Sequence, residues 1–165
     1  MCGIGGIISI NKELPFNEKT QQNMLNLMTV LERRGTDAWG IYLKHVKEKN
    51  HLNCWNVDKS IDGELFKFGS SVSEWFGKFG GVIDTDNLII ALFHTRATTT
   101  GSSEKNINNH PFNSKDFILA HNGTISNADT LKSRNNFNYE VETDSYIILA
   151  LIQKYYDEEK DVVKA

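Results

Sequence analysis

The continuous apolar run Leu-Ile-Ile-Ala-Leu-Phe at residues 88–93 constrains the fold more than any other segment of the chain. A run without polar residues is typical of a β-strand buried on both faces, and this one is far shorter than the roughly 20 residues of a membrane-spanning helix. The polar residues His94, Thr95 and Arg96 follow it directly. The sequence therefore predicts a central, covered strand whose end brings these side chains to a surface.

Patterns elsewhere predict a mixture of strands and helices. Short β-branched or apolar segments predict further strands at residues 2–10, 40–46 and 117–120. Apolar residues spaced three and four apart between Met24 and Leu31 predict an amphipathic helix that ends before Gly35. A second helix is expected from residue 144 to about residue 156, with Thr143 as its N-cap. Residues 47–81 are weakly patterned and residues 98–114 are expected to form a long loop, so the predicted class is α+β.

Length and charge narrow the function classes. The chain has 165 residues and a formal net charge of −3 at pH 7, with its lysines and arginines dispersed. This size suits one domain over residues 1–165, and the charge gives no electrostatic reason to expect nucleic-acid binding. The amino terminus lacks the basic segment, sustained apolar run and cleavage site of a secretory signal, so a cytoplasmic protein without a membrane partner is expected.

The cysteines and histidines give little support for a disulfide or a metal site. Cys2 and Cys54 are the two cysteines of the chain, and a cytosolic setting disfavours a bridge between them. The five histidines show none of the short paired spacings that structural zinc sites use. No metal and no cofactor is therefore expected.

Cys2 becomes the terminal residue if the initiator Met1 is removed, and a small side chain at position 2 favours that removal. A terminal cysteine carries a thiol and a free α-amino group on one residue, so the amine, with a reference pKa near 7.7 to 8.0, can act as the base for the thiol. Cys2 can also be a small apolar residue at the start of a strand, and its position alone favours that interpretation.

Other candidate groups have ordinary structural interpretations too. His121-Asn122-Gly123 offers a side-chain amide and an unhindered backbone N–H, the two donor types of an oxyanion hole, but Asn-Gly is also a common turn. Arg96 can bind a carboxylate through two parallel hydrogen bonds, or it can be solvated. Asp144 can bind an ammonium group, or it can be a favourable charge in the first turn of the final helix. Taken one at a time, these groups favour the structural interpretation.

Six short motifs in a fixed order favour the functional interpretation of these groups over the structural one. They are CGI (2–4), RGTDAWG (34–40), HTR (94–96), NNHP (108–111), HNG (121–123) and ETD (142–144). Together they resemble the glutaminase domain of class II glutamine amidotransferases, which are N-terminal nucleophile hydrolases. Their pattern is nearer to glucosamine-6-phosphate synthase than to asparagine synthetase. The resemblance implies an α/β/β/α sandwich.

The resemblance also implies an activity and a set of roles. L-glutamine would be hydrolysed to glutamate and ammonia, and the ammonia would pass to a partner synthase subunit or domain. Cys2 would attack the side-chain amide, with Asn122 and the Gly123 N–H stabilising the oxyanion. Arg96 would bind the α-carboxylate of the substrate and Asp144 its α-ammonium group. The other matched positions are Thr99 and His110, which would line the pocket, and Arg34 and Asp37, which would support the nucleophile.

The sequence departs from the glucosamine-6-phosphate synthase pattern in its pocket and in its length. Relatives of that type read HTRWATHG where this chain reads HTRATTTG (94–101), so a Trp and a second His are missing, and Phe112 stands where a His is common. The predicted elements suffice for one sheet and one helical layer, so we expect a sandwich that is incomplete or reduced at its C-terminal end. Residues 1–165 would then be a fragment, the N-terminal part of a longer domain or of one split between two chains, or a reduced version of the fold. Such a sandwich exposes apolar surface of the first sheet, which predicts a partner chain, a homo-oligomer or poor solubility.

Two other hypotheses stay open. The chain could be a catalytically idle module of the same fold that binds glutamine or docks on a synthase. It could also hydrolyse a different amide, although Arg96 and Asp144 would still require an amino-acid head group.

Overall fold

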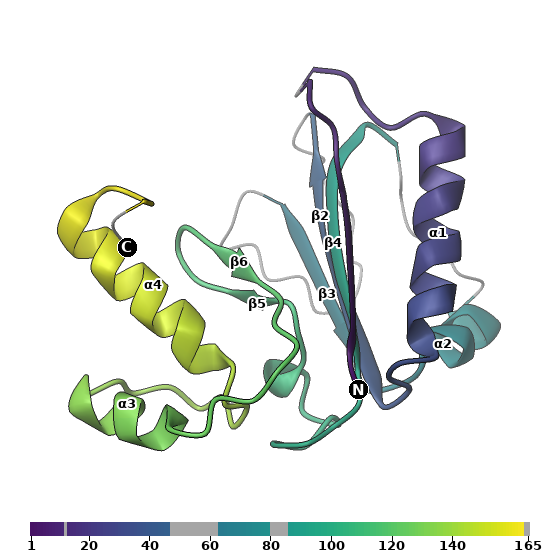
Figure 1. Ribbon diagram of the computed structural model, residues 1–165. Helices are drawn as coiled ribbons and strands as arrows, with labels where there is room; N and C mark the ends of the chain where they lie inside the picture. Colours follow the sequence, from purple (N-terminus) through teal and green to yellow (C-terminus); the bar gives the residue numbers. More distant parts are fainter. Residues whose placement is uncertain (12, 47–62, 80–85, 164–165) are drawn as a thin grey trace.

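The computed structural model describes residues 1–11, 13–46, 63–79 and 86–163. Over these residues the chain has a four-stranded antiparallel sheet, a two-stranded sheet, four α-helices and one short 3-10 helix. The two sheets belong to two halves of the molecule that lie side by side in Figure 1. The predicted α+β class is confirmed.

The larger sheet is built around the predicted central strand. Its order is β1 (Gly3–Ile8), β4 (Leu88–Arg96), β2 (Ala38–His45) and β3 (Glu64–Phe68), with antiparallel neighbours throughout. β4 lies inside the sheet, where most of its side chains are buried, because its apolar run can be covered on both faces. The register pairs Gly3 with Thr95. It also pairs Ala38 with Arg96. The starts of β1 and β2 therefore meet the end of β4 at one end of the sheet.

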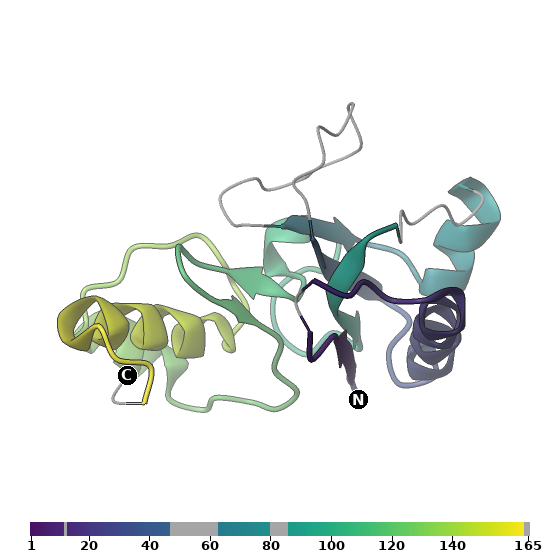
Figure 2. The same cartoon turned by 90° about the horizontal axis from the view of Figure 1, so that it is seen from above.

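Helices α1 (Glu18–Glu32) and α2 (Val72–Phe79) lie on one face of this sheet, as Figures 1 and 2 show. Met24 and Met28 of α1 are buried against the sheet, which confirms the helix predicted from the apolar spacing. The buried core of this half consists of Phe16, Met24, Met28, Trp39, Ile41, Leu43, Val72, Leu88, Ala91 and Phe93.

The second half of the chain forms the smaller sheet and two helices. It contains η1 (Asn106–Asn108), β5 (Phe112–Asn113), β6 (Ile118–Leu119), α3 (Ala128–Arg134) and α4 (Tyr146–Glu159). A second apolar cluster of Phe112, Val141 and Leu149 joins the β5–β6 pair to α4. Figure 2 shows this half on the opposite side of the larger sheet from α1 and α2. Across the molecule, the layers therefore run helices, larger sheet, smaller sheet, helices.

The two halves meet over β2 and β3. A Cβ atom at Gly40 would lie 2.2 Å from the His110 carbonyl oxygen, so the chain before β5 crosses directly over β2. Close approach of two backbones requires a glycine at this point. Nearby, Lys67 Nζ of β3 lies 5.2 Å from the centre of the Phe112 ring of β5.

Several elements differ from the sequence-based predictions. The strands predicted at residues 2–10, 40–46 and 117–120 are Gly3–Ile8, Ala38–His45 and Ile118–Leu119. The last helix begins at Tyr146, so the prediction of Thr143 as its N-cap is wrong; the Thr143 hydroxyl donates instead to the Asn108 carbonyl oxygen at 2.8 Å. β3 and α2 lie in the weakly patterned segment, and η1 and β5 lie in the predicted loop. No pattern predicts α3, because this seven-residue helix buries no side chain.

Apolar side chains are exposed along β1. Ile4 is 39% exposed and Ile8 is 68% exposed. Because side chains alternate along a strand, both point to the same face of the sheet. This exposure is expected of a sheet whose second face is only partly covered.

Among the described residues, no helix has the length and apolar character needed to span a membrane, and no group of three or more His, Cys, Asp or Glu residues is arranged to hold a metal ion. Cys54 lies outside the described residues, so the interpretation of the two cysteines stays a prediction.

Candidate functional site

The candidate site lies where β1 and β2 begin and β4 ends. Cys2 precedes β1, Asp37 precedes β2 and Arg96 is the last residue of β4. The Asp37 N–H donates to the Arg96 carbonyl oxygen at 3.0 Å, which extends the ladder between these strands by one residue. Strand pairing thus brings together three residues that the motifs assign to one site.

Cys2 and Asn122 meet although 120 positions separate them in the chain. Asn122 Nδ2 donates to the Cys2 carbonyl oxygen at 3.1 Å, and Arg34 Nε donates to the same oxygen at 2.9 Å. The half-buried Cys2 thiol donates to the Ala97 carbonyl oxygen, 3.6 Å away. Met1 is 84% exposed. The backbone of Cys2 is therefore held by two side chains, while the residue before it projects into solvent.

The turn that carries Asn122 and Gly123 is fastened to the start of α4. His121 Nδ1 lies 2.9 Å from the hydroxyl oxygen of Ser145, a residue that is 2% exposed. Ser145 occupies the N-cap of α4, yet its hydroxyl makes no capping hydrogen bond. A Cβ atom at Gly123 would lie 2.8 Å from the His121 ring, so the ring packs against that glycine. The sequence assigns no role to His121 or Ser145: His121 is noted only as part of the HNG motif, and Ser145 lies outside all six motifs.

Arg96 is buried, with only 3% of its surface exposed, so its interpretation as a solvated arginine is wrong. Its guanidinium donates to neutral acceptors: Nη1 to Asn109 Oδ1 at 2.7 Å, and Nη2 to the carbonyl oxygens of Thr100 and Gly101 (3.1 Å for Gly101) and to Thr143 Oγ1 at 3.4 Å. Burial lowers the pKa of Arg96, while the charges of Cys2, Asp37 and Asp144 act in the opposite direction.

Asp144 faces the same loop as Arg96. Asp144 Oδ2 accepts from the Ile125 N–H at 2.6 Å, and Oδ1 accepts from the Thr100 hydroxyl at 3.2 Å. The Thr100 carbonyl oxygen also accepts from Arg96. Thr100 therefore contacts both residues that are predicted to bind the amino-acid head group of the substrate. Asp144 precedes α4 (Tyr146–Glu159) and is not in its first turn, so the interpretation of Asp144 as a first-turn helix charge is wrong.

Of the two predicted pocket residues, His110 is buried and Thr99 is exposed. The His110 ring stacks on the His94 ring, with centres 4.3 Å apart. Neither nitrogen of His110 has a hydrogen-bond partner among the described residues. Burial lowers the pKa of His110 to about 2, and positive neighbours, His94 foremost, act in the same direction. Burial also lowers the pKa of His94 to about 4.

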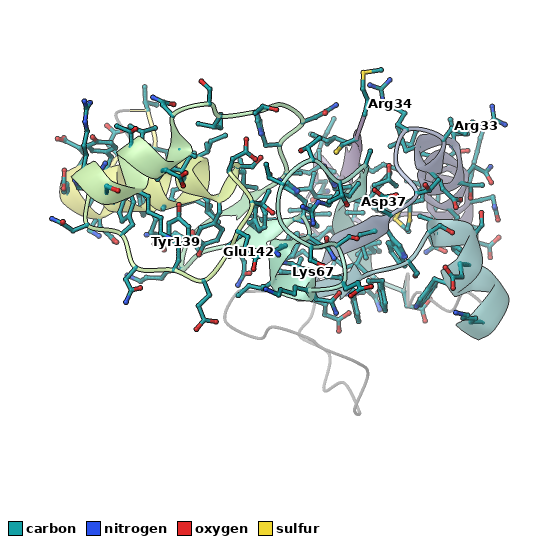
Figure 3. The ribbon with its side chains drawn as sticks, turned by 90° about the horizontal axis from the view of Figure 1, so that it is seen from below. Arg33, Arg34, Asp37, Lys67, Tyr139 and Glu142 are labelled. Carbon is teal, nitrogen blue, oxygen red and sulfur yellow. The ribbon has the colours of Figure 1, made fainter. Side chains whose placement is uncertain are left out.

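Arg34 and Asp37, the predicted supporting residues, contact the backbone on either side of the site. Asp37 Oδ2 accepts from the Thr98 N–H at 2.8 Å, while Arg34 holds the Cys2 carbonyl oxygen. Figure 3 shows both on the half of the molecule that carries α1, whereas Tyr139 lies on the other half. These two side chains thus hold the backbone before β1 and after β4.

Two buried asparagines connect the end of β4 to the segment before α4. Asn108 and Asn109 are both 0% exposed. Asn108 Nδ2 donates to Glu142 Oε2 at 2.8 Å, and Asn108 Oδ1 accepts from the Glu142 N–H at 2.8 Å. Asn109 Oδ1 accepts from Arg96, and its Nδ2 donates to the Ser103 carbonyl oxygen at 2.7 Å. Both asparagines belong to the NNHP motif, but the sequence predicts no role for them because composition does not distinguish a buried amide from a loop amide.

Comparison with known proteins places the chain among distant relatives. No family model matches it. The chain is 28% identical over 162 residues to the glutamine–fructose-6-phosphate aminotransferase (isomerizing) of Streptococcus pneumoniae serotype 4, and 29% identical over 162 residues to that of Lactococcus lactis subsp. lactis. Both alignments cover 96% of this chain and 23% of the relative. The 7-cyano-7-deazaguanine synthase 2 of Sulfurisphaera tokodaii is 24% identical over 168 residues, or 99% of this chain and 33% of that protein.

The chain therefore spans about a quarter to a third of the length of these relatives. Glutamine–fructose-6-phosphate aminotransferase is another name for glucosamine-6-phosphate synthase. The similarity supports the resemblance that the motifs indicate, at the level of distant homology to its glutaminase domain.

Proposed function

We propose that this chain is a class II glutamine amidotransferase domain that hydrolyses the side-chain amide of L-glutamine to glutamate and ammonia. The observation that carries the proposal is the contact between Asn122 Nδ2 and the Cys2 carbonyl oxygen at 3.1 Å. It joins a nucleophile at one end of the larger sheet to an amide donor from the other half of the molecule. The distant similarity to glutamine–fructose-6-phosphate aminotransferases supports the same activity.

In the proposed mechanism, removal of Met1 frees the α-amino group of Cys2, which takes the proton of the thiol. The thiolate attacks the amide carbon of glutamine, and Asn122 Nδ2 and the Gly123 N–H donate to the oxyanion that forms. The protonated α-amino group returns its proton to the leaving nitrogen, which departs as ammonia. Water then hydrolyses the γ-glutamyl thioester to release glutamate and restore the thiol.

Recognition of the amino-acid head group is assigned to Arg96 and Asp144. A substrate carboxylate would replace the Thr100 and Gly101 carbonyl oxygens as acceptors of hydrogen bonds from Arg96. A substrate ammonium group would replace the Thr100 hydroxyl as the donor to Asp144. Thr99 and His110 would line the pocket, while Arg34 and Asp37 keep the nucleophile in place.

The fold and partners of the proposed enzyme follow from the same arrangement. The layer order supports a reduced α/β/β/α sandwich in which the second sheet has two described strands. Ammonia is lost as a nucleophile when it is protonated in bulk water, so a synthase subunit or domain should receive it directly. The exposed apolar residues of β1 suit contact with such a partner or with a second copy. No cofactor enters the chemistry, and we place the enzyme in the cytoplasm.

Intact-mass spectrometry with a glutamine-mimicking diazoketone, 6-diazo-5-oxo-norleucine, tests the proposal together with an assay of ammonia release. We expect loss of Met1, one adduct on Cys2 and glutamine-dependent ammonia. The matched control is Cys54→Ala, which should keep the adduct, whereas Cys2→Ala should lose it. Glutamine hydrolysis that survives Cys2→Ala would refute the mechanism.

A catalytically idle glutamine-binding or docking module is the second candidate. It is favoured by Thr100, whose carbonyl and hydroxyl groups contact Arg96 and Asp144 in place of a substrate. Binding of glutamine without an adduct or ammonia release would select it. Hydrolysis of another amino-acid amide in preference to glutamine would select the third candidate instead.

A further inference from the structure

Arg96 is a charged side chain in a buried position, where its guanidinium donates to neutral oxygens. It is 3% exposed, and each acceptor of its guanidinium among the described residues is a neutral carbonyl, amide or hydroxyl oxygen. The nearby carboxylates of Asp37 and Asp144 accept hydrogen bonds from other groups. A buried guanidinium without a directly bonded carboxylate retains a strong attraction for an anion.

Asn109 supplies the one side-chain amide oxygen among the acceptors that the described residues give Arg96. Its side chain is 0% exposed, and its Oδ1 lies 2.7 Å from Arg96 Nη1. The amide cannot turn around, because Nδ2 donates to the Ser103 carbonyl oxygen at 2.7 Å. The oxygen of Asn109 is therefore directed at Arg96 by a contact on its other side.

We propose that Asn109 is a specificity-determining positioning residue: it holds the Arg96 guanidinium through a neutral oxygen and so leaves the positive charge for the α-carboxylate of an amino-acid ligand. This inference rests on the proposed function. An aspartate at the same position would accept the same hydrogen bond, but it would neutralise the guanidinium and repel the ligand carboxylate. The preferred ligand class is thus a free amino acid, and the α-amide of the same amino acid should bind more weakly.

Asn108 provides a matched control. It is the neighbouring residue, it is equally buried, and its side chain contacts Glu142 and the Ser102 carbonyl oxygen but not Arg96. An aspartate at position 108 would face the carboxylate of Glu142. That change disturbs the same buried network without placing a charge on the guanidinium.

Isothermal titration calorimetry with L-glutamine and with L-glutamine α-amide tests the inference, using the full chain with Cys2→Ala so that turnover does not interfere. We expect the chain to bind glutamine at least about tenfold more tightly than its α-amide. Asn109→Asp should reduce this preference to about threefold or less. Asn108→Asp should weaken both ligands by a similar factor and keep the preference. A tenfold preference that survives Asn109→Asp, or its absence in the parent chain, overturns the inference.

A second variant covers the case in which Asn109→Asp does not fold, as judged by thermal denaturation. Asn109→Ser retains a neutral oxygen, so glutamine should still bind more tightly than its α-amide by about fivefold or more; loss of the preference overturns the inference.

Ammonia release by the chain with Cys2 intact separates the two proposals. Selective binding without hydrolysis would refute the proposed activity and leave the role of Asn109 standing. Equal hydrolysis of glutamine and its α-amide would support the proposed activity and overturn the role of Asn109.

Discussion

The interior of the larger sheet and the boundary between the two halves are stabilised in different ways. Between α1 and the sheet, large apolar side chains such as Met28, Ile41 and Phe93 are buried, and their contribution grows with the area removed from water. At the boundary, Arg96, Asn108 and other polar groups are buried and joined by hydrogen bonds. Burial of polar groups stabilises a structure only when they find partners, so the stability of the boundary depends on individual contacts.

This difference separates what supports the fold from what supports the proposed chemistry. The proposed nucleophile Cys2 and the proposed oxyanion donor Asn122 come from opposite sides of the boundary, and one hydrogen bond joins them. Changes at the boundary should therefore affect activity more than stability, and changes in the core should do the opposite.

The largest expected effect is the loss of activity in Cys2→Ala. Removal of the proposed nucleophile should reduce glutamine hydrolysis by roughly 10⁴-fold or more. The melting temperature should barely change, because the half-buried thiol makes a single sulfur hydrogen bond. Ammonia release and thermal denaturation measure the two quantities. A large fall in melting temperature would show that Cys2 belongs to the structural core instead.

Truncation of the apolar core should give the opposite result. Phe93→Ala should lower the free energy of unfolding by about 3–5 kcal/mol, since Phe93 is 1% exposed and packed beneath α1. The matched control is Ile8→Ala on β1, where the side chain is 68% exposed and the change should stay within about 0.5 kcal/mol. Urea unfolding measures both. Equal destabilisation by the two variants would contradict the assignment of this core.

At the boundary, Asn122→Ala should lower kcat by roughly 10²- to 10³-fold, the usual effect of removing one oxyanion donor. Asn122 is exposed, so its truncation should leave the melting temperature near that of the parent chain. Steady-state assays of ammonia release measure the change, with Asn23→Ala on the exposed side of α1 as the control. An unchanged kcat would mean that the Asn122 contact to Cys2 is structural.

The apolar half could be predicted from the sequence because its signals extend over several neighbouring residues. The spacing between Met24 and Leu31 predicts α1, and the apolar run before His94 predicts a buried central strand. Both signals report burial directly, because apolar side chains occupy the positions that face the core. The element boundaries were less predictable, since the ends of strands depend on pairing with distant residues.

The boundary could not be predicted in this way. Nothing in the local sequence shows that Arg96 is buried or that the Thr143 hydroxyl contacts Asn108 instead of capping a helix. Such contacts join residues far apart in the chain, and each occurs once. The motifs grouped Cys2 with Asn122 only through the family resemblance, and no motif indicates the contact between His121 and Ser145.

The smallest effect we predict is a pH dependence of stability from the stacked histidines at the boundary. The pKa is about 4 for His94 and about 2 for His110, against about 6.5 in an unfolded chain, because burial disfavours the charged rings. Between pH 6.5 and 4 the unfolded chain therefore binds more protons than the folded chain, and stability falls as the pH falls. For His110 alone, the loss between pH 7 and pH 5 is about 2 kcal/mol.

His110→Gln tests this value, because glutamine does not titrate in that range. Urea unfolding at pH 7 and pH 5 should show a smaller loss of stability in the variant than in the parent chain, by about 2 kcal/mol. Carboxylates that titrate over the same interval are present in both proteins and cancel in the comparison. If both chains lose the same stability on acidification, the His110 ring is accessible to protons in the folded state. The boundary would then be wetter than the sheet interior, and its hydrogen bonds would contribute correspondingly less to holding the two halves together.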